Sequence, residues 1–303
     1  MIKPLIAVSA LSLAMASAIG PVFAADVGQA PAKNIVVFYP GSSGMEWILT
    51  GTEHGGAKAV KKGEPCTGCH VDEKTGMNES AEIGAKILSG AKSKNAALEP
   101  EPVKGKPGSI PVSVQASHDA DNLYLRFTWK NTGFLSGNKM DPDNPLKLAV
   151  MLEEIGKVEL DSTGGCWATC HNDVRTMPGV KDDKKTKYVK DGNLATGKFF
   201  DLFQFRSGSG QKMVDGHIAD KRVMEGGMAL QEAKGELNGD TWTVNFKRKL
   251  KGGDGDVTLQ PGKEYNFGFA IHDDYTIGRY HYVSFGYTLG LGNAGASINA
   301  VKQ

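Results

Sequence analysis

Apolar and polar residues alternate along two short segments near the middle of the chain. Val112, Val114 and Ala116 alternate with polar neighbours, and the same period of two returns over residues 123–129. A period of two places apolar side chains on one face of a strand. Asp119 to Asn122 provides turn residues between the two segments, so the pattern predicts a β-hairpin.

Further strands are expected over residues 146–152, 242–248, 265–271 and 280–289, with a glycine-rich turn at 252–255. Several short strands joined by such turns are typical of an antiparallel β-sandwich or open barrel. We therefore predict a mainly β domain over residues 105–303. Residues 172–235 look less regular and contain an aromatic cluster over 199–205.

The N-terminal part has a different pattern. A short strand is predicted over 34–39 and a short helix within 45–60, broken around Gly55 and Gly56. Residues 80–88 fit either helix or strand. Residues 91–111 are rich in Lys, Pro, Gly and Glu, which indicates a linker or a long surface connection. We expect a small loop- and helix-rich module over residues 25–104.

Residues 1–24 have the pattern of a cleaved signal peptide. Lys3 precedes an apolar run, and Pro21 to Ala24 forms a small-residue site before Ala25. The alternative is a membrane anchor, but the run is short and lacks stop-transfer charges. No later segment is long and apolar enough to span a bilayer, so we expect the mature chain in the periplasm or an equivalent compartment.

The charge of the chain is balanced. The sequence has 35 Lys and Arg residues against 34 Asp and Glu residues, and removal of residues 1–24 removes Lys3. A neutral chain is a poor match for nucleic acid. It is compatible with local charged patches that dock other redox proteins.

Cys66-Thr67-Gly68-Cys69-His70 is a C-x-x-C-H motif, the attachment pattern of c-type haem. Two thiols must reach two vinyl groups on one edge of the porphyrin, and the adjacent histidine must reach the iron. The motif predicts a covalent haem held by Cys66 and Cys69, with His70 as an iron ligand.

A second motif, Cys166-Trp-Ala-Thr-Cys170-His171, contains one residue more between its cysteines. A bulged loop can still present both thiols and the following histidine to one haem. We predict a second covalent haem on Cys166 and Cys170, with His171 on its iron.

Three other interpretations of the four cysteines remain open at this stage. An even cysteine count in an exported protein favours disulfides. Four cysteines and two histidines also match zinc, although zinc ligands usually cluster within a small domain. The first pair fits a redox dithiol, although a thioredoxin-like βαβ context is missing.

Haem iron in electron carriers usually has a second axial ligand, His or Met. We expect His54 for the first iron, because Gly55 and Gly56 let the backbone approach a flat macrocycle. We expect His281, between two tyrosines, for the second. His118 is the main competitor, whereas His217 and His272 look like loop residues.

Four segments resemble the haem-binding domain of ethylbenzene dehydrogenase-type gamma subunits. They cover residues 116–129, 164–171, 242–248 and 268–273. The resemblance implies a β-sandwich that holds haem, and it extends over residues 105–295. In those subunits a non-covalent haem is held by Met and Lys. Here His281 is in what looks like the position of that lysine, so the chain resembles a dihaem c-type branch with an added N-terminal haem module.

These observations predict a periplasmic dihaem cytochrome c that transfers electrons between redox proteins. The alternatives are a dihaem oxidoreductase with one open iron site, a haem subunit of a molybdoenzyme, and a filament-forming cytochrome. No catalytic site stands out. Asp273-Asp274 and Glu153-Glu154 look like solvated strand ends.

Overall fold

The computed structural model describes residues 27–41, 45–49, 54–72, 80–92, 98–136, 140–159, 161–170, 188–278 and 280–303. The signal peptide predicted over residues 1–24 lies outside these ranges. Within them, no helix is both long enough and apolar enough to cross a bilayer.

The described chain is mainly antiparallel β-structure, as predicted. Its strands are β1 (Lys33–Phe38), β2 (Ser109–His118), β3 (Asn122–Lys130), β4 (Lys147–Glu153), β5 (Phe200–Arg206), β6 (Met213–Ile218), β7 (Arg222–Val223), β8 (Leu230–Asn238), β9 (Thr241–Lys249), β10 (Glu264–His272), β11 (Tyr282–Val283), β12 (Tyr287–Leu291) and β13 (Ile298–Lys302). The helices are η1 (Val27–Gln29), α1 (Met45–Leu49), α2 (Ala57–Val60), α3 (Thr67–His70), α4 (Ser80–Leu88), α5 (Asp161–Cys170) and η3 (Leu194–Thr196).

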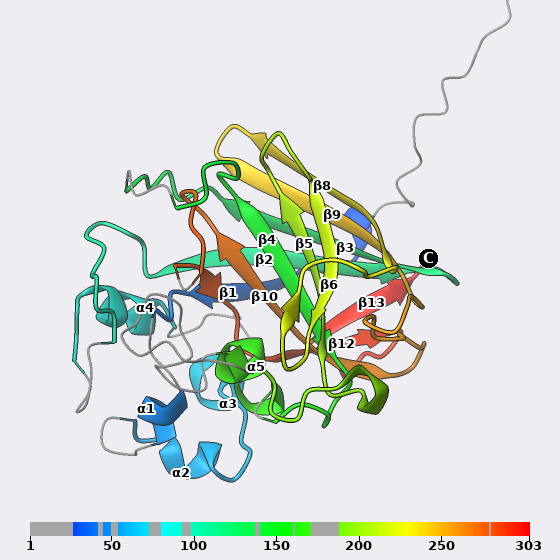
Figure 1. Cartoon of the computed structure of the whole chain (residues 1–303), viewed down its shortest axis with the longest axis horizontal. Helices are drawn as coiled ribbons and strands as arrows, with labels where there is room; N and C mark the ends of the chain where they lie inside the picture. The colour runs from blue at the N-terminus through cyan, green and yellow to red at the C-terminus, as the bar shows by residue number, and fades with distance from the viewer. Residues whose placement is uncertain are drawn as a thin grey trace, which may run out of the picture.

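The strands form two layers that are joined at one side. Their order is β7-β6-β5-β4-β10-β11-β1-β2-β3-β9-β8, and β12 and β13 provide a second link from β10 to β2. In Figure 1 the strands β1 and β2 cross the direction of β10, β4 and β5. Among the described strands, only the contacts of β13 with β12 and β2 are parallel.

Aromatic side chains fill the space between the layers. The ring of Phe127 on β3 lies 5.1 Å from that of Phe269 on β10, and Phe203 on β5 lies 5.2 Å from Phe246 on β9, between centroids. Phe127, Phe203 and Phe246 are at most 2% exposed. These rings bury large apolar areas and join strands that are far apart in sequence.

The predicted hairpin is present as β2 and β3, with Val112 paired with Trp129 and His118 paired with Leu123. Residues 80–88, which fitted helix or strand, form α4. The segment predicted as one strand over 280–289 is divided between β11 and β12. Between them, the Ser284 N–H donates to the Phe269 carbonyl (2.9 Å), and the Ser284 hydroxyl accepts a hydrogen bond from the Phe269 N–H (3.0 Å).

The expectation of irregular structure over 172–235 was wrong for its C-terminal half. Strands β5 to β7 lie there and β8 begins there. The sequence of β5, Phe-Asp-Leu-Phe-Gln-Phe-Arg, does not alternate because nearly all of this strand is buried on both faces.

The N-terminal helices gather at one end of the sandwich. Figure 1 shows α1, α2 and α3 together, with α5 between them and the strands. Strand β1 belongs to the same sequence region but lies inside the sheet, between β11 and β2. The helices that carry the two cysteine motifs are therefore held against one end of a rigid β-domain. The division into units at 25–104 and 105–303 stays a prediction.

The segment predicted as a linker is partly built into the protein. Lys106 forms a buried ion pair with Asp273 (2.9 Å), and its ammonium lies 4.8 Å from the centre of the Tyr282 ring. Glu99 is fully buried and accepts a hydrogen bond from the Tyr39 hydroxyl (2.7 Å). Residues 98–107 are therefore held against this side of the sheet by buried polar contacts.

The acidic pairs expected to be solvated are also buried in part. Glu153 is 0% exposed and accepts hydrogen bonds from the N–H groups of Lys157 and Val158, both at 2.7 Å. Asp273 and Asp274 are 4% and 7% exposed. The prediction for Asp273 and Asp274 was wrong because their partners Lys106, Thr132 and Ser136 come from segments far away in the sequence.

Candidate haem-binding centres

The first cysteine motif forms a short helix. Cys66 caps α3 at its N-terminus, and Cys69 and His70 follow at the third and fourth positions after it. Side chains three and four residues apart lie on the same face of a helix. In the structure Cys66 is buried and faces the neighbouring cavity together with His70, whereas Cys69 is exposed.

A mainly apolar cavity of about 180 Å³ lies beside this helix. Phe38, Ile48, Leu98, Trp167 and Phe285 contribute apolar walls, and His54, Cys66 and His70 also face it. Because Phe38, Trp167 and Phe285 come from β1, α5 and the segment after β11, the cavity is completed by residues that are widely separated in sequence.

His54 and His70, the two residues expected on the first iron, both line this cavity, and their role as its ligands stays a prediction. Their ring centroids are 6.0 Å apart and their planes differ by 23°. A metal bonds a histidine nitrogen at about 2 Å, so two imidazoles on opposite sides of one iron have centroids about 6 Å apart. Burial, followed by the neighbouring His70, lowers the pKa of His54, which favours the neutral imidazole that binds metals. These residues fit an iron porphyrin.

Gly56 gives His54 the room that it needs. A Cβ atom at Gly56 would lie 2.9 Å from Cε1 of the His54 ring. The neighbouring Gly55 has no heavy atom within 4 Å of such a position. Gly56 thus has a direct steric role beside the imidazole, whereas Gly55 leaves open space.

The second motif is also helical, which explains how it tolerates its extra residue. Cys166 and Cys170 are four positions apart on α5, so they lie on the same face of the helix. In a helix, cysteines that are three or four positions apart lie on the same face, so either spacing can present two thiols to one haem. The next residue, His171, lies outside the described residues, so its predicted role as a ligand stays a prediction.

A backbone kink positions the second motif. Gly165 interrupts α5 with a φ of 73°. A Cβ atom on this residue would lie 2.5 Å from the backbone nitrogen of Gly286. The kink thus needs glycine for its left-handed backbone and for the close approach of the segment after β11.

Cys166 lies on the outer face of β10, in an apolar cluster separate from the main core. The cluster members are Ala149, Val158, Cys166, Val189, Phe200, Leu202 and Ile218. A Cβ atom at Gly268 would lie 3.2 Å from Cys166 Sγ. Because side chains two residues apart share one face of a strand, Gly268, Ala270 and His272 form a low shelf beginning at this thiol.

His281 lies beside His272, close to the end of this shelf. Their ring centroids are 4.7 Å apart and their planes differ by 22°. Gly268 and His272 are about 13 Å apart along the strand at the usual rise per residue. Burial lowers the pKa of His281 to about 4, and the nearby cationic residues add to this effect, whereas the hydrogen bond to Gly278 opposes it.

A backbone carbonyl lies directly against the His281 ring. Its Nδ1 lies 2.6 Å from the Gly278 carbonyl oxygen. A carbonyl on one ring nitrogen selects the tautomer that leaves the other nitrogen available to a metal. His281 therefore has the local environment of a metal-binding histidine. His272, which looked like a loop residue, ends β10 and packs on this ring.

His118 does not join the first centre. It ends β2, and Ser109 at the other end of that strand pairs with Phe38 of the cavity. Nine residues of strand separate these positions by about 30 Å. His118 Nδ1 instead lies 3.0 Å from the Asp119 carbonyl oxygen.

No disulfide joins any of the four cysteines, all of which lie within the described residues. Burial raises the pKa of the Cys66 thiol to about 11, which disfavours the thiolate that a redox dithiol needs. The described residues bring no set of three cysteines and histidines together as zinc would require, since the one candidate metal group found among them is acidic.

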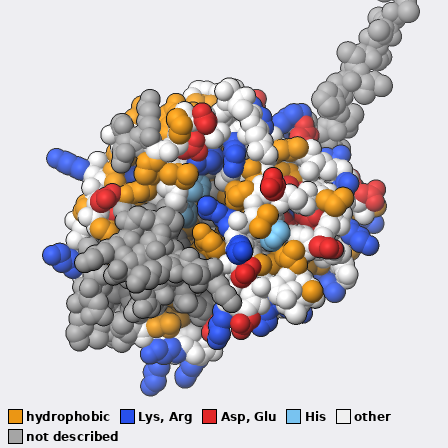
Figure 2. All heavy atoms as spheres, in the orientation of Figure 1, with side chains coloured by type: hydrophobic (Ala, Val, Ile, Leu, Met, Phe, Trp, Pro, Cys, Tyr) orange, Lys and Arg blue, Asp and Glu red, His pale blue; other side chains and the backbone are white. Residues whose placement is uncertain are grey.

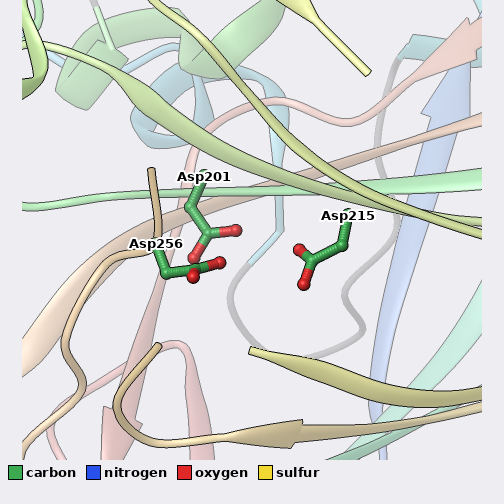
Figure 3. Close-up of side chains that lie close together, drawn as sticks. All are labelled: Asp201, Asp215 and Asp256. Carbon is green, nitrogen blue, oxygen red and sulfur yellow. The ribbon is translucent and has the colours of Figure 1, made fainter. Parts of the chain in front are cut away.

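This acidic group lies inside the sandwich. Carboxylate oxygens of Asp201, Asp215 and Asp256 lie within 4.8 Å of one another, and Figure 3 shows the three side chains facing each other. The buried Arg248 forms an ion pair with Asp201. Burial raises the pKa of Asp201 to about 6 although Arg248 opposes this change. Because Arg248 already supplies a positive charge beside these carboxylates, we assign the three aspartates a structural role.

The surface shows no strong charge bias on the side that Figure 2 displays. Basic and acidic side chains are mixed across it. This distribution agrees with the balanced composition of the chain.

Comparison with known proteins agrees with the resemblance found in the sequence. The family model described as "Ethylbenzene dehydrogenase" matches residues 85–239 and 216–284. Cytochrome c-552 of Stutzerimonas stutzeri is 54% identical over 300 residues, covering 95% of this chain and 98% of that protein. Cytochrome c-551 of Rhodocyclus tenuis is 38% identical over 281 residues, covering 92% and 100%.

Among solved structures, a carbohydrate-binding module of family 9 from Caldicellulosiruptor kristjanssonii, in complex with glucose, gives a TM-score of 0.31 at 10% identity. The match covers 63% of this chain and 72% of that one.

Proposed function

We propose, from the premise that the chain belongs to the ethylbenzene dehydrogenase family, that it is a periplasmic cytochrome c with two covalent haems that transfers electrons between redox proteins. Both curated relatives are named as cytochromes c and match almost the whole chain. Those names support an electron carrier with haem c. The number of haems and the compartment rest on the sequence motifs.

The relationship between His54 and His70 carries the proposal. Two nearly parallel imidazoles 6.0 Å apart border an apolar cavity that the Cys66 thiol also faces. Cys66 and Cys69 would form the thioether bonds, while His70 and His54 would hold the iron from two sides. When bound, haem supplies an iron that accepts and releases one electron. The apolar walls exclude water from this site.

For the second haem, Cys166 and Cys170 would supply the thioethers and His171 and His281 the axial nitrogens. Gly268 on β10 lies directly beside Cys166, where a Cβ atom would come within 3.2 Å of the Cys166 Sγ. The Gly278 carbonyl would keep the His281 ring turned for binding.

Two histidines on each iron would leave no position for a substrate. This favours electron transfer to another protein over chemistry at the metal. Methionine raises the potential of haem iron, so two bis-histidine haems should have lower potentials than His/Met cytochromes. Contacts with the donor and acceptor proteins would be small and transient.

Electron paramagnetic resonance of the oxidised protein, combined with a pyridine haemochrome assay, tests the proposal. We expect two haems c per chain and two low-spin ferric signals. A high-spin signal from one haem would instead favour an oxidoreductase with an open iron site. Stable co-purification with a large catalytic subunit would favour a molybdoenzyme haem subunit.

A further inference from the structure

Trp167 is part of the second cysteine motif in the sequence, but in the folded chain its side chain lies at the first haem centre. It follows Cys166 directly, yet its side chain lines the cavity that His54, Cys66 and His70 face. The residue is 3% exposed. The second attachment helix therefore provides part of the wall of the first haem centre.

The two motifs are also joined through their backbones. The N–H of Cys66 donates a hydrogen bond to the carbonyl of Thr163 in α5, at 2.8 Å. A Cβ atom at Gly164 would lie 3.7 Å from Cys66 Sγ, in ordinary contact. The start of the first motif thus rests directly on the helix that carries the second, and the two centres have a fixed separation.

Aromatic rings fill the space from this helix to the first iron ligand. The centroid of Trp167 lies 6.4 Å from that of Phe285 and 5.5 Å from that of Phe38. Phe285 in turn lies 5.7 Å from the ring of His70, with planes 29° apart. Phe38 and Phe285 are 1% and 3% exposed. A continuous, water-free set of rings thus extends from the residue next to Cys166 to the imidazole of His70.

We propose that Trp167 and Phe285 form the path for electron transfer between the two haem centres. The proposal rests on the proposed dihaem function. One electron leaves one iron, which is oxidised, and reaches the other, which is reduced. No bond forms or breaks, and the rings themselves are not oxidised. Close-packed rings carry a tunnelling electron better than a gap, and replacing a buried ring by a smaller side chain leaves such a gap.

The test uses the holoprotein and three variants of the path, Phe285→Leu, Trp167→Leu and Trp167→Phe. Trp242→Leu is the control, because Trp242 stacks on Trp129 between β3 and β9 and does not line the haem cavity. Pulse radiolysis adds one electron to the oxidised protein. The concentration-independent phase that follows reports internal electron transfer, and potentiometric titration gives the driving force.

We expect a several-fold slower internal phase in Phe285→Leu and Trp167→Leu at equal driving force, a smaller decrease in Trp167→Phe, which keeps an aromatic ring, and an unchanged rate in Trp242→Leu. If the Trp167→Leu variant does not incorporate the second haem, the rate of internal electron transfer in Phe285→Leu decides whether the proposed path is correct. An unchanged rate in Phe285→Leu, or no internal phase in the wild type, would overturn the proposed path.

Haem stoichiometry separates this proposal from the one on which it rests. A wild type that carries fewer than two haems contradicts the proposed function itself. A wild type with two haems and a rate that is insensitive to Phe285 contradicts only the path.

Discussion

The imidazole rings of His54 and His70 lie 6.0 Å apart across the end of an apolar cavity, although 16 positions separate them in the sequence. α3 presents His70 next to the thiols, and the turn at Gly56 makes room for His54. This pair defines the first centre, and it makes the ligand set directly testable.

Replacing His54 by Met should raise the potential of one haem and leave the other nearly unchanged, because methionine ligation raises the potential of haem iron. Spectroelectrochemical titration measures both potentials. His118→Asn is the matched control, since His118 lies about 30 Å along β2 from the residue paired with Phe38. A shift in the control alone would remove His54 from the ligand set.

His281→Ala should convert one haem from low spin to high spin, because the ring held by Gly278 would be lost. His272→Asn should preserve two low-spin haems, since His272 is assigned to packing against that ring. Paramagnetic resonance of the ferric protein distinguishes the two variants. The opposite result, with loss of low-spin character only in His272→Asn, would make His272 the ligand.

Arg248→Met should destabilise the fold by about 3–5 kcal/mol, because it leaves the buried Asp201 carboxylate without its ion-pair partner. Lys130→Met is the control. Its ion pair with Asp240 is exposed at both side chains, 79% and 65%, so its loss should leave the free energy of unfolding nearly unchanged. Urea unfolding of both variants gives the free energies. Equal small losses would show that the buried pair contributes little.

Asp119→Asn should cost about 1–2 kcal/mol at neutral pH through weaker hydrogen bonds in the β2–β3 turn. Burial opposes ionisation of Asp119, but hydrogen bonds from the Tyr124 hydroxyl and from the N–H groups of Asp121 and Asn122 outweigh it and lower the pKa to about 2. An unfolded aspartate titrates near pH 4, so the folded state binds fewer protons between these values.

The contribution of Asp119 is therefore complete above about pH 5 and disappears as the pH falls toward 2. The difference in unfolding free energy between wild type and Asp119→Asn should shrink over this range. Asp121→Asn, at an exposed position of the same turn, should show little difference at any pH. A constant difference for Asp119→Asn would contradict the assigned pKa.

The sequence correctly predicted those strands that have a regular apolar pattern. β2, β3, β9 and β10 alternate or form apolar runs, and they occur where expected. β5 was missed because Asp201 faces inward to the distant Arg248, which removes the apolar period. The polar partner of a buried carboxylate cannot be read from neighbouring positions.

The same limit applies to the haem centres. The cysteine motifs are local, and α3 and α5 place their thiols as the spacing requires. Trp167 and Phe285 could not be assigned to the first cavity from sequence, because their position depends on how α5 packs on the N-terminal helices. His272 was predicted to lie in a loop, because its contact with His281 forms only when β10 and the segment before β11 meet.

Intact-mass analysis of the protein purified from a periplasmic fraction tests the central claim most directly. We expect the mass of residues 25–303 plus two haem groups that resist acid–acetone extraction. A mass equal to the bare polypeptide, or the addition of a single haem, would contradict a dihaem cytochrome c.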